Sequence, residues 1–152
     1  MSEPSVLLNH TYEFTLENFS FDSLPIDVVI NTYKDGRVFS HFVERWMATK
    51  FPLTWVDNCK EYDFVDNNND EIKYDEKTFT TNGVNFAPSI MKGGGRHVVQ
   101  SIFEEKANKL IYAIASNVSF PNIKIRFVRG SELIKKYPNG CIRPTHHDAF
   151  FA

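Results

Sequence analysis

Two carboxylates and a lysine in the middle of the chain are spaced as a group that could act together. Asp63 lies in a β-prone segment at residues 61–66, and Asp75 and Lys77 lie in a second one at residues 71–80. The Asn-rich run between the two segments is typical of a turn, so they are expected to form a hairpin. Pairing about this turn places Asp63 opposite Asp75. Lys77 shares a face with Asp75 because side chains alternate along a strand.

Two directly opposed carboxylates indicate that a cation lies between them. Their Cβ atoms would be about 4.5–5.5 Å apart, where two negative charges repel each other unless a positive ion intervenes. Oxygen ligands suit Mg²⁺, which is held by one or two carboxylates with water and phosphate, and Mn²⁺ is expected to substitute. A lysine beside the ion could orient water or neutralise developing charge. Asp63, Asp75 and Lys77 therefore form a candidate set for metal-assisted phosphodiester hydrolysis.

Two other interpretations of the hairpin remain open. Glu71 and Lys73 repeat the acid-x-lysine spacing, but Glu71 adjoins the turn. Its cross-strand partner would be Asp66 or Asn67, at the tip of the hairpin, so this pair ranks second. The whole set could also be a solvated hairpin with alternating charges, because acidic residues and lysines are common on protein surfaces.

The elements around the hairpin predict a single α/β domain. The chain has 152 residues, 42% of them hydrophobic, which is enough for one core. Apolar residues at helical spacing predict a helix from residue 37 to about 50, opened by Asp35-Gly36 or Ser40 and closed before Pro52. The other expected elements are strands at residues 11–21, 26–33, 53–56 and 123–128, a long helix at about 96–116, a short helix at 131–137 and an irregular tail. The long helix would cross over to make strand 123–128 parallel to the second hairpin strand.

The order of these elements carries a family resemblance. Helix–strand–strand–strand–helix–strand, with Asp63 on the second strand and Asp75-Glu76-Lys77 on the third, resembles the PD-(D/E)xK nuclease superfamily over residues 37–137. The resemblance implies a restriction-endonuclease-like mixed sheet flanked by helices, an αβββαβ core, here with an N-terminal β extension. It also implies that Asp63, Asp75 and Lys77 are catalytic and that the two aspartates bind the metal. Glu44 matches the additional helical glutamate of many members.

The chain departs from the family pattern at two positions. Tyr62 precedes the first acid where the family has proline, and Asp75 stands where glutamate is commoner. The small size and the N-terminal extension are most similar to small phage- or intron-encoded homing endonucleases. The resemblance therefore implies a metal-dependent, sequence-specific DNA endonuclease of homing or restriction type. A junction-resolving or repair nuclease, or a non-catalytic DNA-binding or interaction domain, are the alternatives.

The charge is distributed unevenly along the chain. Residues 1–88 carry 7 Lys/Arg and 15 Asp/Glu, a net charge of −8, whereas residues 89–152 carry 10 Lys/Arg and 4 Asp/Glu, a net charge of +6. Such asymmetry is a recognised sign of polyanion binding. A Gly-rich run at 92–97 and a strand with one basic face supply candidate phosphate contacts. The expected DNA-binding residues are Asn82, Lys92, Arg96, His97, Lys124 and Arg126.

Assembly and location are also expectations. Cutting both DNA strands needs two active sites, so we expect a homodimer or homotetramer. Residues 1–36 are the candidate segment for oligomerisation or DNA contact, and residues 37–152 form the nuclease core and C-terminal tail. The tail sequence His146-His147-Asp148 is expected to contact DNA or a second subunit rather than a metal. Without a secretory signal, a spanning segment or a disulfide framework, a cytoplasmic protein of a phage or bacterial-type host is expected.

Overall fold

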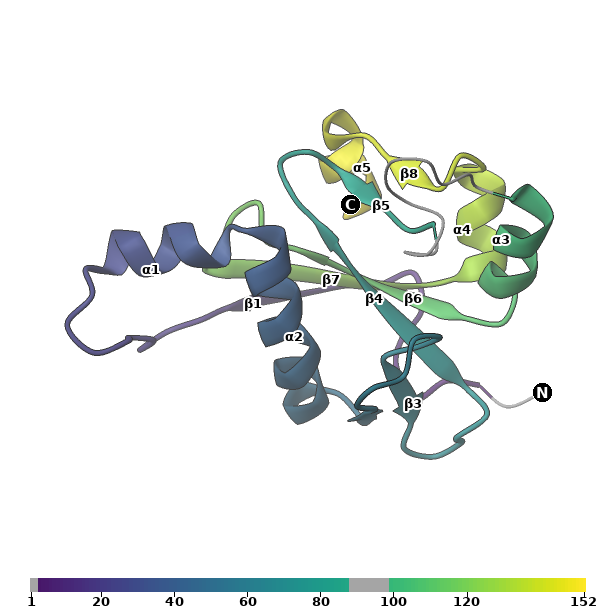
Figure 1. The fold of residues 1–152 in the computed structure, drawn as a ribbon, viewed down its shortest axis with the longest axis horizontal. Coiled ribbons are helices and arrows are strands. Elements are labelled where there is room, and N and C mark those ends of the chain that lie inside the picture. Colours follow the sequence, from purple (N-terminus) through teal and green to yellow (C-terminus); the bar gives the residue numbers. More distant parts are fainter. Residues whose placement is uncertain (1–2, 88–98) are drawn as a thin grey trace.

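The computed structural model describes residues 3–87 and 99–152 and has a mixed six-stranded sheet with helices on both faces (Figure 1). The fold is therefore α/β, as predicted. Only the pair formed by β4 and β6 is parallel, and all other neighbours are antiparallel. Across the sheet, the strands are β1 (Thr11–Thr15), β7 (Asn122–Arg129), β6 (Ile111–Ser116), β4 (Lys73–Phe79), β3 (Phe64–Asp66) and β2 (Leu53–Trp55).

Two apolar cores lie on the two faces of this sheet. One contains the buried side chains of α2, and the other contains those of α3, α4 and α5. A two-stranded ribbon, β5 paired with β8, covers part of the second face. The helices are α1 (Ile26–Tyr33), α2 (Gly36–Lys50), α3 (Gln100–Ala107), α4 (Gly130–Lys136), the 3-10 turn η2 (Pro144–His146) and α5 (His147–Phe150), and the ribbon strands are β5 (Val84–Asn85) and β8 (Cys141–Ile142).

Helix α2 forms where its sequence predicts it. The Asp35 side chain accepts hydrogen bonds from the backbone N–H groups of Arg37 and Val38, at 3.0 and 3.2 Å, which satisfies two of the free donors at the helix start. The apolar stripe on its inner side is fully buried at Phe39, Val43 and Met47. The helix ends at Lys50, before Pro52, because proline cannot continue the hydrogen-bond pattern. This places Ser40 and Glu44 on a fixed face beside β4.

The strand predicted at residues 26–33 is wrong, because this segment is helix α1. β-branched residues favour strands when they are considered alone. Here Val29 and Tyr33, one helical turn apart, turn toward the core beside α2, and Tyr33 stacks on Phe120 with ring centroids 5.4 Å apart. The carbonyl of Pro25 accepts the first helical hydrogen bonds from Val28 and Val29. Packing at helical spacing therefore overrides β propensity.

The long helix predicted at residues 96–116 is also wrong. Residues 88–98 lie outside the described part, α3 ends at Ala107, and residues 111–116 form β6 in the middle of the sheet. Every residue of β6 is buried, and its sequence is largely apolar up to Ser116 and lacks the alternation of a half-exposed strand. The crossover after β4 leads to a parallel neighbour, but that neighbour is β6. Strand β7, which matches the strand predicted at 123–128, is antiparallel to β6.

The first and last described segments both pack into the fold. Strand β1 pairs with β7 at one edge of the sheet, and Ser5 binds the Asp66 carboxylate through its backbone N–H at 2.8 Å and its hydroxyl. The tail, predicted to be irregular, contains β8, η2 and α5. Within the described ranges, none of the helices has the length and apolar character needed to cross a bilayer.

Candidate functional site

The hairpin of β3 and β4 has the register that its turn predicts. Phe64 pairs with Tyr74 and Val65 with Lys73, and Asp63 directly precedes β3, at the end of this ladder. The Asp63 backbone N–H donates to the Tyr74 carbonyl at 2.8 Å. Its carboxylate accepts a hydrogen bond from the backbone N–H of Glu76, with the two atoms 2.7 Å apart. Asp63 is therefore fixed directly against the strand that carries Asp75 and Lys77.

A helical carboxylate and a lysine complete this cluster. Glu44, on α2, lies close enough to the Asp63 side chain to share a proton with it in a hydrogen bond, and Asp63 lies against Asp75 in the same way. The Lys77 ammonium lies 3.3 Å from a carboxylate oxygen of Asp75, and the two side chains are only 18% and 14% exposed. All four predicted catalytic residues thus come together, from α2, the residue before β3 and the middle of β4.

The electrostatics of this cluster favour binding of a positive species. Burial, together with the charges of Asp75 and Glu44, raises the pKa of Asp63 to about 8. Burial also raises the pKa of Glu44, although the nearby His41 opposes the shift. At neutral pH the cluster therefore retains a proton on Asp63, because three neighbouring carboxylates cannot all be ionised in so confined a place. A cation could replace that proton.

Glu76 belongs to the same site and was not predicted as a functional residue. It is 5% exposed and accepts hydrogen bonds from the hydroxyls of Ser40 and Thr78, both at 3.0 Å. Burial and the charge of Glu44 raise its pKa well above the usual range. Strand alternation does place Glu76 on the face opposite Asp75. Only the position of Ser40, one turn before Glu44 on α2, could have indicated that this face also borders the site.

An open groove of about 1080 Å³ contains the cluster. Its acidic centre is formed by Glu44, Asp63, Asp75 and Glu76. Basic side chains also line the groove: Arg37, Lys60, Lys77 and Lys106, together with His41. A surface with an acidic centre among basic residues could hold a cation and a polyanion at the same time.

The donor set fits Mg²⁺ held in its usual manner. Asp63 and Asp75 present carboxylate oxygens, which are the ligands that this hard cation prefers. In the described part of the chain, no group of three or more His, Cys, Asp and Glu side chains is arranged as a ready metal cage. The two aspartates would thus act as a partial ligand set, with water and phosphate oxygens supplying the remaining positions.

The alternative acid-x-lysine pair near the hairpin tip has structural contacts instead. Lys73 donates to the backbone carbonyl of Asp70 at 2.9 Å and lies over the Tyr62 ring. Asp66, on the facing strand, is buried. Burial alone would raise its pKa, but hydrogen bonds from Ser5, Tyr74 and Asn68 outweigh this effect and lower it. These residues hold the N-terminal segment against the hairpin and do not line the groove.

The predicted DNA-binding residues that lie in the described part of the chain do not line this groove. Lys92, Arg96 and His97 lie outside the described residues. Asn82 is exposed in the turn after β4, and Lys124 and Arg126 lie on β7, two strands away from β4. The Arg126 guanidinium donates to the Thr11 hydroxyl at 2.9 Å and to the Ala152 carbonyl at 3.3 Å. The described basic residues that line the groove are therefore a different set from the predicted one.

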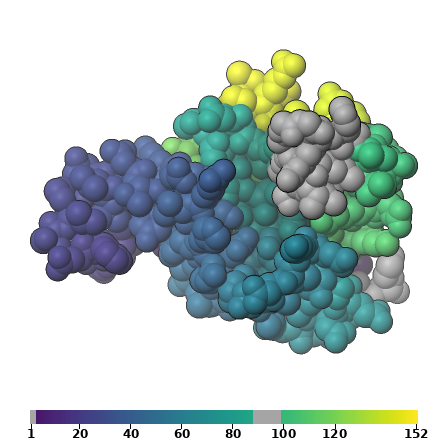
Figure 2. Space-filling model, viewed as in Figure 1, coloured from purple at the N-terminus to yellow at the C-terminus, as the bar shows by residue number. Residues whose placement is uncertain are grey.

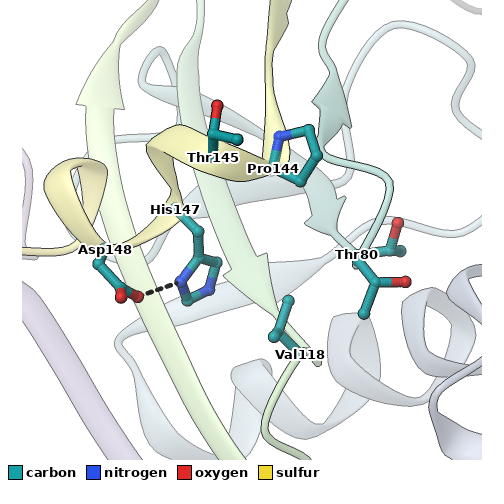
Figure 3. A pocket seen from close by; sticks show the side chains of 7 residues that line it. Thr80, Val118, Pro144, Thr145, His147 and Asp148 are labelled. Atoms are coloured by element: carbon teal, nitrogen blue, oxygen red, sulfur yellow. Dashed lines mark hydrogen bonds and ion pairs between the residues drawn. The ribbon is translucent and has the colours of Figure 1, made fainter.

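A second, smaller pocket of about 270 Å³ lies under the C-terminal segment (Figure 3). His147 borders it, and its ring is 2.7 Å from the Ser116 hydroxyl through Nε2 and 2.9 Å from Asp148 through Nδ1. This order of groups is that of a nucleophilic triad, but Ser116 is 2% exposed and accepts a hydrogen bond from the Val118 N–H at 3.3 Å. A substrate could not reach the buried Ser116. The contacts among Ser116, His147 and Asp148 instead hold the C-terminal segment against the end of β6.

No family model, characterised protein or solved structure matches this chain.

Proposed function

We propose that this protein is a metal-dependent DNA endonuclease that hydrolyses phosphodiester bonds, sequence-specifically and in the manner of homing or restriction enzymes. The observation that carries the proposal is the convergence of Glu44, Asp63, Asp75 and Lys77 in one groove lined by basic side chains. The order α2, β2, β3, β4, α3, β6 supports it, because this is the element order of the PD-(D/E)xK core.

Each residue of the cluster has a distinct task in this proposal. Asp63 and Asp75 hold Mg²⁺ or Mn²⁺, which when bound would polarise the phosphodiester and lower the pKa of water. The Glu76 N–H fixes the Asp63 carboxylate at 2.7 Å, so that its position does not depend on side-chain freedom. Lys77, paired with Asp75 at 3.3 Å, holds positive charge where the phosphate gains negative charge. Glu44 supports Asp63 from the helix.

The basic side chains supply the contacts to the substrate backbone. Arg37, Lys60 and Lys106 come from three separate segments and line the same groove as the acids. Contacts of this kind position a nucleic acid without reading its sequence. Base recognition and cleavage of the second strand would require more surface than one groove offers, which supports a homodimer or homotetramer.

The decisive test is cleavage of a mixed DNA substrate by the purified full chain. Plasmid, genomic fragments and branched junctions would be incubated with Mg²⁺, with Mn²⁺ and with EDTA. We expect the wild type to cleave DNA with Mg²⁺ and not with EDTA. Asp75→Asn should cleave at least about 10²-fold more slowly, whereas the matched surface variant Asp70→Asn should cleave like the wild type. Failure of the wild type to cleave any substrate, or full activity of Asp75→Asn, would contradict the proposal. A preference for junctions would assign a resolvase.

A further inference from the structure

An ordered arm projects from the sheet and exposes apolar side chains. It consists of residues 17–33, that is, the segment after β1 and helix α1, and it extends past the end of the sheet (Figure 1). In the space-filling view it forms a purple-to-blue lobe beside the main body (Figure 2). Every residue from Ser20 to Val28 is exposed. The apolar members are Phe21 at 68%, Leu24 at 50%, Ile26 at 53% and Val28 at 43% exposure.

The arm is held firmly at its base. The buried Asn117 side chain donates to the backbone carbonyls of Tyr33 and Lys34, at 3.3 and 2.9 Å, at the end of α1. The Tyr33 ring stacks on Phe120 and meets Phe42 edge-on, each at 5.4 Å between ring centroids. The tip has its own turn, in which the Leu24 N–H donates to the Phe21 carbonyl at 3.2 Å. The exposed side chains are therefore presented in a fixed arrangement.

Such a patch is unusual on a surface that remains in water. Four large apolar side chains are exposed within eight consecutive residues of the arm, two around the turn at its tip and two in the first turn of α1. Exposed patches of this kind mark interaction sites. The net charge of the arm is unfavourable for binding DNA. Residues 17–35 contain four acids and one lysine, a net charge of −3, which opposes contact with a phosphate backbone.

We propose that the arm binds the arm of a second copy of this chain, with the two α1 helices antiparallel about a two-fold axis. Asp27, in the first turn of α1, and Lys34, its C-cap residue, lie seven residues apart, about two turns along one side of the helix, and both are exposed. In an antiparallel pair, each Asp27 meets the partner's Lys34, so both ends of the contact gain a complementary pair. The apolar side chains of the two arms then cover one another. This contact stands independently of the nuclease proposal.

A charge exchange tests the pairing directly. The mass of the full chain without DNA would be measured by sedimentation equilibrium from about 1 to 100 μM, the range in which a protein contact of moderate strength is resolved. We expect a wild-type dimer, weakened at least about tenfold by Asp27→Lys or by Lys34→Asp alone. The double variant Asp27→Lys/Lys34→Asp restores complementarity and should restore the dimer. A double variant as weak as the single ones would overturn the antiparallel arrangement.

A matched apolar pair tests the surface itself. Ile26→Ser should weaken the dimer at least about tenfold, whereas Ile102→Ser, at a residue of similar exposure (51%) on α3, should leave it unchanged. Thermal unfolding of both variants would verify that the fold is intact. A monomeric wild type, or equal effects of the two variants, would overturn the inference. Loss of DNA affinity without any dimer would instead assign the arm to DNA.

The result for the arm contact can be distinguished from the result for the nuclease proposal. A dimer that cleaves no DNA would retain the arm contact and reject the enzyme. A monomer that nicks one strand in a metal-dependent manner would retain the enzyme and reject the arm contact.

Discussion

The Asp63 carboxylate accepts a hydrogen bond from the Glu76 backbone N–H, with 2.7 Å between the two atoms. Glu76 lies between Asp75 and Lys77, so this bond places Asp63 at the centre of the acid-x-lysine segment. The pKa of Asp63 is nevertheless raised to about 8, because burial and the charges of Asp75 and Glu44 outweigh the bond. The Asp63 side chain is thus held in one position, and full ionisation of the cluster is unfavourable.

Stability without metal should fall as pH rises. The folded-state pKa of Asp63 is about 8, against about 3.9 in the unfolded chain. Between these pH values the folded state binds a proton that the unfolded state has released, so the free energy of unfolding decreases with pH and levels off above about 8. The raised pKa values of Glu44 and Glu76 act in the same direction. Asp66, with a lowered pKa, acts in the opposite direction only at lower pH.

Asp63→Asn isolates this effect. The amide retains a carbonyl that can accept from Glu76 but cannot ionise. In EDTA at pH 8.5 the variant should be more stable than the wild type by at least about 1 kcal/mol, and near pH 4 the two should be equal. Asp70→Asn, at the exposed hairpin turn, should have no such pH-dependent effect. Chemical denaturation across pH measures these differences, and parallel pH profiles of wild type and Asp63→Asn would contradict the expectation.

Mg²⁺ should stabilise the fold, and more strongly at higher pH. The ion must displace the proton held by Asp63, so its apparent affinity should increase as pH rises toward 8. At ten times its Kd, the ion would add about 1.4 kcal/mol to the free energy of unfolding. Thermal unfolding with Mg²⁺ against EDTA measures this effect. Because Asp75→Asn removes the negative charge of one of the two proposed ligands, a stabilisation by Mg²⁺ that is equally large in this variant would place the ion elsewhere.

Lys77 and Lys73 should differ sharply, although both are lysines of β4. Lys77 pairs with Asp75 inside the groove, whereas Lys73 donates to the Asp70 carbonyl near the hairpin tip. Lys77→Ala should reduce DNA cleavage by about 10²-fold or more and leave Mg²⁺ stabilisation intact, since it removes charge stabilisation but no metal ligand. Lys73→Ala should cleave within about twofold of wild type. The reverse pattern in initial rates would favour the pair near the hairpin tip.

The stability of the C-terminal segment should depend on His147 and not on its neighbour His146. His147 is hydrogen-bonded to the buried Ser116, and its ring meets Phe79 and Phe151 with centroids 4.9 Å away in each case. His147→Ala should reduce the free energy of unfolding by about 1–3 kcal/mol because a buried hydroxyl loses its partner. His146→Ala, at an exposed position, should change it by less than about 0.5 kcal/mol. Urea denaturation compares them, and equal losses would exclude the His147 contact as their cause.

Much of the candidate site could be predicted because it is local in sequence. Asp63, Asp75 and Lys77 belong to one hairpin, so a turn and the two-residue period of strands suffice to bring them together. Helix α2, with Asp35 at its start and Pro52 after its end, follows from capping and periodicity, and it carries Glu44. The role of Glu76 and the basic lining from Lys60 and Lys106 could not be predicted, because those residues meet only through contacts between distant elements.

By itself, the sequence determined the α/β class, helix α2 and the register of the hairpin formed by β3 and β4. Only the tertiary structure decided that residues 26–33 are a helix and that residues 111–116 are the central strand. The physical reason is the same in both cases. A run of apolar, β-branched residues is compatible with a helix or with a strand, and the outcome depends on which distant surfaces bury it. The raised pKa of Asp63 likewise exists only where folding brings Asp75 and Glu44 around it and removes water.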